Sequence, residues 1–280
     1  SAWAALGVSG WKRGSFAGCV DIDALLLLTA RLGDADARLR EEALDWCASN
    51  LAYVSRTRLA RLLEDGAAPG QWSQWAATLE RATKQRWPGA GEALDWKPSG
   101  KSRAPRRDDA AALALRCRAL MGTTVRADLL RVLLLEPHDR PFDVRDLATE
   151  AAYSKRAVAE ALEGLELSGV VRGTRVGNTQ RYELERRDEL ERVLGPLPQF
   201  RASQRAFCSI AAHVLQTAKA TEKAPEIVQK VEASRLERAL VHDLARVELT
   251  PRRQEPRLAT VGDWTRWCGE RAAEFSTLDG

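Results

Sequence analysis

The sequence predicts a mainly α-helical protein with one small β-hairpin near its centre. Along most of the 280 residues, apolar side chains recur three and four positions apart, which is the spacing of one helix face. The stretch GVVRGTRVGNTQRYEL (Gly169 to Leu184) differs, because two apolar-alternating runs flank a Gly-Asn pair, as in two strands joined by a tight turn. A hydrophobic content of 45% with 29% charged residues is typical of a globular chain rather than a disordered one.

The N-terminal third, residues 1–96, is predicted to be a helical domain with a net charge of −1. Asp34 and Ser55 are well placed as N-caps, since their side-chain oxygens can accept a hydrogen bond from a free N–H of the first turn. A second helix-turn-helix over Ala43–Leu63 is conceivable, but no hairpin follows Leu63, so a helical bundle element is the preferred interpretation. The four predicted helices are Asp21–Leu32, Asp36–Asn50, Ser55–Glu64 and Trp72–Arg86.

Residues 97–107 (KPSGKSRAPRR) are predicted to be a basic linker. Five basic and no acidic side chains give this segment a charge of +5, and its proline, glycine and serine residues favour extended or turning backbone. Two interpretations stay open. The segment is either a solvated hinge or an arm that contacts phosphates through Arg103, Arg106 and Arg107.

Residues 108–194 contain the most informative order of elements. Asp108–Met121 is a preceding helix, and Val125–Glu136 is the next. Another helix begins after Phe142 in DVRDLATEAA and ends at a short turn, and Ser154 caps the following helix, which ends at Gly169 before the hairpin. Helix, helix, tight turn, helix and hairpin is the order of a winged helix-turn-helix, three helices plus a β-hairpin wing.

The run DLATEAAYSKRAVAEALEGLELSGVVRGTRVGNTQRYEL resembles winged-helix transcription regulators of the broad MarR and GntR kind, over residues 123–194. Within it, LEGLELSGVVRG matches that family's habit of ending the recognition helix at a glycine and entering a strand. The resemblance implies that Val158, Leu162 and Leu165 form the inward face of the recognition helix. It also implies that Leu147 and Ala148 pack against this face from the preceding helix.

The residues expected to face DNA follow from the helical spacing. If Val158, Leu162 and Leu165 point inward, the residues between them point outward, and the first turn of such a helix reaches base edges in the major groove. Wing arginines suit phosphate or minor-groove contact, and the turn before the helix could hold a phosphate. The predicted DNA-binding residues are Ser154, Lys155, Arg156 and Glu160 on the helix, Arg172, Arg175, Asn178, Thr179, Gln180 and Arg181 on the wing, and Arg103, Arg106 and Arg107 in the linker.

The charge of residues 123–194 supports an alternative. Their 12 basic and 14 acidic side chains give a net charge of −2, so most of the acids must face away from DNA. Glu160 either accepts from a cytosine amino group or repels phosphate. Because a fold does not fix a function, a non-catalytic adaptor that docks on proteins through the winged helix is the alternative.

A third hypothesis is a nucleotide-using enzyme. GSFAGCVDID (Gly14 to Asp23) resembles the nucleotidyltransferase pattern, in which Asp21 and Asp23 would hold Mg²⁺. The spacing from Ser15 to Asp21 is shorter than that family uses, and a role at the start of the following helix is the competing interpretation. Five scattered cysteines and three isolated histidines offer no metal-ligand spacing. We therefore predict no catalytic residues, no metal and no cofactor.

Residues 195–280 are predicted to be a C-terminal helical region. Its helices are expected at Ala202–Glu222, Pro225–Glu248 and Val261–Phe275. Four apolar residues repeat every three or four positions along the second of these helices, as the exposed seam of a homodimer would. A two-fold dimer would place two winged helices about 34 Å apart, one DNA turn. The seam residues are Leu236, Leu240, Leu244 and Val247.

The tryptophans allow two interpretations. Trp72 with Trp75, and Trp264 with Trp267, have helical spacing, which indicates core or interface anchors or else a pocket for a small-molecule effector. No apolar run is long enough to cross a bilayer and no secretory signal is visible, so a cytoplasmic location without a membrane partner is expected. The function that the sequence favours is sequence-specific binding of double-stranded DNA, as a homodimeric transcription regulator.

Overall fold

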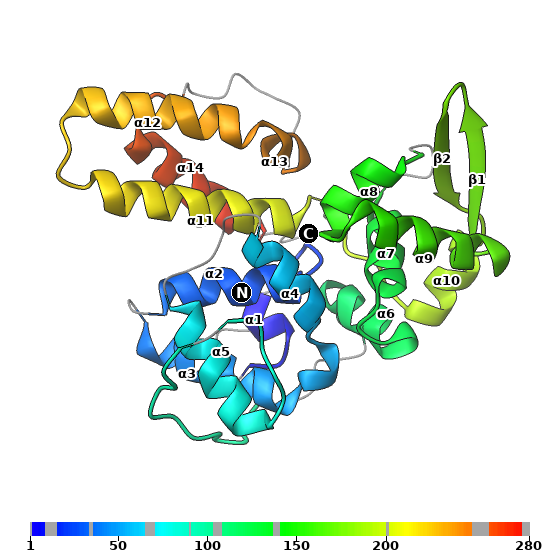
Figure 1. Ribbon diagram of the computed structural model, residues 1–280, viewed down its shortest axis with the longest axis horizontal. Helices are drawn as coiled ribbons and strands as arrows, with labels where there is room; N and C mark the ends of the chain where they lie inside the picture. The colour runs from blue at the N-terminus through cyan, green and yellow to red at the C-terminus, as the bar shows by residue number, and fades with distance from the viewer. Residues whose placement is uncertain are drawn as a thin grey trace.

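The structure is a computed structural model that describes residues 2–8, 16–33, 36–64, 71–89, 91–102, 108–136, 141–199, 202–247 and 258–275. It is mainly helical with one two-stranded antiparallel hairpin, as the sequence predicted. In Figure 1 the N-terminal helices lie at the lower left, the C-terminal helices at the upper left, and the central helices with the hairpin on the right. The predicted positions Gly14, Ser15, Arg103, Arg106 and Arg107 lie outside the described residues.

The N-terminal helices begin where side chains cap them. Asp21, Asp36 and Ser55 each accept a hydrogen bond from the backbone N–H three residues further on, and the next residue begins the helix. The cap of α3 is thus Asp36 and not the predicted Asp34, which lies outside the described residues. A short first helix was not predicted. Its Trp3 is buried and packs edge-on against Trp46, with ring centroids 5.9 Å apart. The elements are α1 (Ala2–Ala5), α2 (Ile22–Leu32), α3 (Ala37–Ser49), the 3-10 turn η1 (Leu51–Tyr53), α4 (Arg56–Leu62) and α5 (Trp72–Thr83).

The central helices follow the predicted order, with one addition. Three of them and the hairpin enclose a small core of their own, in which Val158 and Leu162 are fully buried. Phe142 pairs with Tyr182 through two backbone hydrogen bonds of 2.7 and 2.9 Å. Phe142 thus forms a one-residue antiparallel bridge at the edge of the hairpin. The elements are η3 (Ala110–Ala112), α6 (Leu113–Met121), α7 (Val125–Leu135), α8 (Val144–Ala151), α9 (Lys155–Leu167), β1 (Val171–Val176), β2 (Thr179–Leu184) and the unpredicted α10 (Arg187–Leu194).

The C-terminal region corrects the predicted dimer seam. Leu236, Leu240 and Val247 are 6%, 3% and 1% exposed, and Leu244 packs beside them in the main core. The seam is therefore an internal surface. The predicted helix Pro225–Glu248 is also interrupted at Leu240, which separates α12 from α13. The elements are α11 (Gln204–Thr221), α12 (Glu226–Ala239), α13 (Val241–Arg246) and α14 (Val261–Glu274).

One large hydrophobic core holds the two ends of the chain together. It contains side chains from α1 to α5 and from α11 to α14, with Trp72, Trp75, Trp264 and Trp267 among them. Both tryptophan pairs are therefore core anchors. The two outer regions share this core, and the domain boundaries at residues 96 and 194 stay predictions. Within the described residues, no helix combines the length and the apolar character needed to cross a membrane.

The first half of the predicted linker is docked rather than free. The carboxylate of Asp45 on α3 accepts hydrogen bonds from the backbone N–H groups of Ser99 (2.6 Å), Gly100 (2.8 Å) and Ser102 (3.0 Å). Burial opposes ionisation of Asp45, but these N–H donors outweigh it and lower its pKa. Asp45 therefore holds Ser99, Gly100 and Ser102 against α3, while the choice between a hinge and a phosphate-contacting arm stays open for the segment.

Candidate nucleic-acid interface

The first turn of α9 presents two cations from a well-defined helix start. The Ser154 hydroxyl accepts from the Ala157 N–H at 3.2 Å, so the predicted N-cap is confirmed. Lys155 and Arg156 are exposed, while Val158, Leu162 and Leu165 on the opposite face are at most 2% exposed. The predicted inward and outward faces of this helix are therefore correct.

Further along, the exposed stripe of α9 is acidic. Glu160 pairs with Arg156 at 2.9 Å, and Glu163 and Glu166 continue the exposed face. Glu166 also accepts from the Gly173 N–H of the hairpin at 3.2 Å, which places its charge beside the wing. Leu167 ends the helix with its side chain 91% exposed. The stripe thus begins basic and becomes acidic and apolar toward its C-terminal end.

The three wing arginines have different surroundings. Arg172 pairs with its cross-strand neighbour Glu183 at 2.7 Å. Arg181 lies 3.7 Å from Asp143 and 3.9 Å from Asp146. Arg175 is exposed and donates only to the Gly177 carbonyl, without an acidic partner among the described residues. It is therefore the wing cation with the least internal compensation.

The tip of the wing is a tight turn. Gly177 has φ +61°, whereas Asn178 is not among the non-glycine residues with positive φ, which matches the two-residue turn that needs glycine first. Asn178 and Thr179 are exposed at the tip, and Gln180 is half-buried opposite Arg175. In Figure 1 the hairpin projects well beyond the helices.

Sequence reasoning missed one cation beside α9. Arg126 on α7 is exposed, and its guanidinium lies over Gly164, where an added Cβ would come within 2.8 Å of Nη2. The signal was a glycine in the middle of a helix, since glycine disfavours helix and usually marks a close approach there. Arg126 therefore places a positive charge next to the acidic half of α9.

The turn between α8 and α9 is inserted into the N-terminal helices. Ala152 has φ +57°, a conformation that L-residues adopt rarely, and it is buried in the main core. The carbonyl of Ala151 accepts from Arg58 Nε at 2.6 Å, and the Tyr153 hydroxyl lies 3.1 Å from Ser55 Oγ. Contacts from α4 therefore hold the strained turn and fix where α9 starts.

A buried ionic network lies beneath this turn. Arg58 binds Asp21 in a bidentate manner at 2.6 and 2.7 Å, and its Nη1 is 3.1 Å from Asp23. Arg118 bridges Asp23 at 2.5 Å and Asp128 at 2.9 Å, and so connects α2 to α7 through α6. The three carboxylates balance the three guanidinium groups. We call this network the ionic hub; its members are Asp21, Asp23, Arg58, Arg118, Asp128 and Arg131.

The ionic hub removes the geometric basis of the metal hypothesis. Asp21 and Asp23 are 1% and 0% exposed, and arginines occupy their carboxylates. Burial opposes ionisation of Asp21, but Arg58 and Arg131 hold its pKa well below the usual range. Asp21 also caps α2. Among the described residues, no cluster of three or more His, Cys, Asp or Glu side chains could hold a metal ion.

A second ion-pair network joins α8 to the C-terminal helices. Glu150 is 5% exposed, accepts from the Ser203 hydroxyl, and lies 3.1 Å from Arg246. Arg246 also pairs with Glu136 at 2.5 Å. Burial opposes ionisation of Glu150, but Arg205 and Arg246 outweigh it and lower its pKa. The segment α7–α9 is thus fixed on two sides by buried ion pairs.

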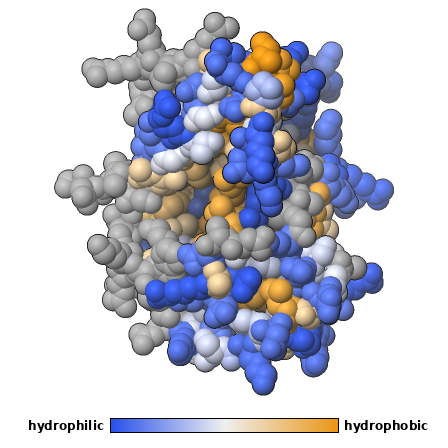
Figure 2. Space-filling model, turned by 90° about the vertical axis from the view of Figure 1, so that its left-hand side faces the viewer, coloured by the Kyte–Doolittle hydropathy of each residue, from blue (hydrophilic) through white to orange (hydrophobic). Residues whose placement is uncertain are grey.

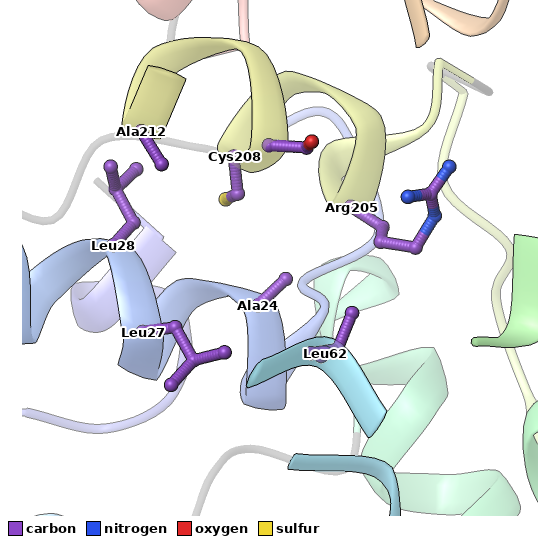
Figure 3. Close-up of a pocket in the computed structure, with 8 residues that line it drawn as sticks. Ala24, Leu27, Leu28, Leu62, Arg205, Cys208 and Ala212 are labelled. Carbon is purple, nitrogen blue, oxygen red and sulfur yellow. The ribbon is translucent and has the colours of Figure 1, made fainter. Parts of the chain in front are cut away.

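Apolar side chains gather across the middle of one face of the molecule, between the C-terminal helices above and the N-terminal helices below (Figure 2). A small pocket between α2, α4 and α11 encloses about 40 Å³. In Figure 3 the guanidinium of Arg205 points away from this pocket, toward Asp243, with which it pairs at 2.9 Å. The volume is well below the roughly 150 Å³ of an apolar cavity that takes up benzene, so the pocket does not fit an aromatic effector.

The chain was compared with protein-family models, curated proteins and solved structures, and none of them matches it.

Proposed function

We propose that the protein binds double-stranded DNA in a sequence-specific manner and acts as a transcription regulator, with α7, α8, α9 and the hairpin as a winged helix-turn-helix. The observation that carries the proposal is the first turn of α9. Lys155 and Arg156 are exposed there, at a helix start that the ionic hub and α4 hold in place. A rigid helix start with two cations suits insertion into the major groove.

The wing supports the same proposal. Arg175 is exposed near the tip, and the hairpin extends away from the body of the protein, where it can follow a DNA backbone (Figure 1). Arg156 is already paired with Glu160, but both side chains are exposed, and such pairs contribute little stability. A base or phosphate can therefore replace Glu160 as the partner of Arg156 at small cost.

We expect the loss of Arg156 and the loss of Arg175 to change DNA binding in different ways. Arg156→Ala should cost roughly 1–3 kcal/mol at one base position and relax the preference there, because it removes a base-edge contact. Arg175→Ala should weaken binding about equally on specific and random duplexes, because phosphate contacts carry no sequence information. Titrations with both kinds of duplex at fixed salt measure this difference.

Arg172→Ala is the matched control for Arg175→Ala. It removes the same charge from the same hairpin, but Glu183 already balances Arg172. We therefore expect a smaller loss of affinity than for Arg175→Ala. Equal losses for the two variants would mean that only the net charge of the wing matters, and unchanged binding of both would remove the wing from the interface.

A non-catalytic adaptor is the second candidate, favoured by the acidic stripe and the exposed Leu167. We expect the double variant Glu163→Gln/Glu166→Gln to separate the two candidates. If α9 enters a groove, removing two negative charges should strengthen non-specific DNA binding, since these carboxylates repel phosphate. DNA binding that stays undetectable before and after neutralisation would favour the adaptor.

Homodimer formation and a small-molecule effector remain part of the proposal without a defined site. The seam proposed from the sequence is internal, so a dimer would use other residues. Ile227 and Val231 on α12 are exposed apolar side chains on that region. Sedimentation of the full chain at several concentrations measures the oligomeric state.

A further inference from the structure

A second basic surface lies on the N-terminal helices. Arg81, Lys84 and Arg86 are exposed at the end of α5 and just after it, and the half-buried Arg56 opens α4. None of the four forms an ion pair within the described residues, but Arg81 donates to the Leu94 and Trp96 carbonyls. Glu80 lines the same hollow as Arg81, Lys84 and Arg86. We call Arg56, Arg81, Lys84 and Arg86 the α4–α5 basic surface. Four cations against this one acid make it a net positive area in a region whose net charge is −1.

Direct contacts connect this surface to the start of α9. Arg56 Nη1 donates to the Arg86 carbonyl at 3.1 Å, which joins α4 to the segment after α5. Ser55, the residue before Arg56, lies with its hydroxyl 3.1 Å from the Tyr153 hydroxyl. Tyr153 is followed by Ser154 and Lys155. These two contacts therefore link the α4–α5 basic surface, through Arg56, to the segment that leads into α9.

The hairpin lies at the other end of α9. The helix has 13 residues, so its length is about 20 Å at 1.5 Å per residue. β1 begins four residues after the helix ends, whereas Tyr153, just before its start, contacts Ser55, the neighbour of Arg56 in the sequence. Cations are thus placed beyond both ends of the helix that we propose to enter the major groove. The helix alone is shorter than the roughly 34 Å of one duplex turn, and cations beyond its two ends lengthen the stretch of DNA that the protein can contact.

We propose that the α4–α5 basic surface is a second contact for duplex DNA, which binds phosphates beyond the groove that α9 occupies. This inference rests on the proposed function of α9 and the hairpin. Arginine and lysine side chains without acidic partners bind phosphates and release counterions, and they add affinity without reading the sequence. The protein therefore covers a longer duplex than its winged helix alone.

The test is a pair of double variants of the full chain, measured on two duplex lengths. Lys84→Gln/Arg86→Gln removes two charges from the α4–α5 basic surface without touching the Arg86 carbonyl. Lys219→Gln/Lys223→Gln is the matched control. It removes two exposed lysines at and just beyond the end of α11, which Figure 1 places on the side opposite the hairpin. Each protein is titrated over a salt series with duplexes of about 12 and about 30 base pairs, roughly one turn and three turns.

We expect the surface variant to differ from the control more on the long duplex than on the short one. The slope of log affinity against log salt should become shallower on the long duplex by up to about 0.9 for each lost phosphate contact. Equal slopes for the two double variants on the long duplex would overturn the inference. If Arg156→Ala still changes sequence preference in that case, the proposed function stands alone. Wild-type protein that binds neither duplex would overturn both proposals.

Discussion

Asp23→Ala is expected to lower the free energy of unfolding by about 3–5 kcal/mol, because it leaves a buried positive charge without a partner. Asp23 is 0% exposed. Its carboxylate accepts from Arg58, from Arg118 and from the Ser55 N–H. After the substitution, three guanidinium groups face two carboxylates in the same enclosed space. Since domains are stable by only about 5–15 kcal/mol, urea unfolding followed by circular dichroism should detect the loss readily.

Asp36→Ala is the matched control for this result. Asp36 also begins a helix of the N-terminal region, and its carboxylate accepts from the Leu39 N–H, but it has no place in the ionic hub. Loss of such an N-cap should cost only about 0.5–2 kcal/mol. A loss of similar size in both variants would show that Asp23 acts as an ordinary helix-start residue.

A charge-balanced variant tests the cause more directly. Asp23→Ala/Arg118→Met removes one charge of each sign, so the remaining hub is again neutral. We expect the double variant to lose less unfolding free energy than the two single variants lose together. Each single variant leaves an unpaired ion, whereas the double variant does not. Additive losses would indicate that packing, rather than charge balance, determines the effect of Asp23.

The elements could be predicted because their signals are local. Ser154 caps a helix through a bond to a residue three positions away, and Gly177 permits its turn through its own φ. The resemblance to winged-helix regulators implied the buried faces of α8 and α9, and helical spacing then placed the residues between them on the outer face. For the same reason, the charged residues of the first turn of α9 could be placed on its outer face before the structure was known.

The ionic hub could not be predicted in the same way, because its partners are distant in sequence. Asp23 and Arg118 are 95 positions apart, and nothing near either residue identifies the other. One signal was present: α7 is apolar on most sides, so Asp128 and Arg131 within it had to be buried and paired. That pattern indicates buried ions but does not name their partners.

The prediction of a C-terminal dimer seam was wrong for a different physical reason. An apolar stripe such as Leu236, Leu240 and Leu244 shows that a helix covers something, and the spacing is the same whether that surface belongs to the same chain or to a second copy. Here the stripe covers α11 and α14. Likewise, the composition of residues 97–102 gave no sign of their contact with Asp45, because that carboxylate lies on another element.

Leu162→Ala is expected to lower the free energy of unfolding by about 2–5 kcal/mol. It should also lower the urea midpoint of regions that Leu162 does not contact. Leu162 is fully buried in the small core of α7, α8, α9 and the hairpin. All nine tryptophans lie in the first 96 or the last 23 residues, so tryptophan fluorescence reports only on the regions around the main core. If the ionic hub couples the two cores, the fluorescence midpoint should move to lower urea together with the circular dichroism midpoint.

Leu167→Ala is the control on the same helix. Its side chain is 91% exposed, so the substitution should change the stability by less than about 0.5 kcal/mol. Leu162→Ala could instead leave the fluorescence transition unchanged while circular dichroism shows an earlier step. That result would mean that the central helices unfold independently.

Combining the two substitutions should reveal the coupling itself. In an Asp23→Ala background the hub is unbalanced, and we expect Leu162→Ala to shift the fluorescence midpoint less than it does in the wild-type chain. The difference between the two shifts measures the coupling free energy, since contacting or networked sites are the ones that depart from additivity. Equal shifts in both backgrounds would place the coupling elsewhere, with the Glu150–Arg246 pair as the remaining buried connection to the C-terminal helices. A reduced shift would identify the ionic hub as the link through which the N-terminal helices hold the start of α9 in position.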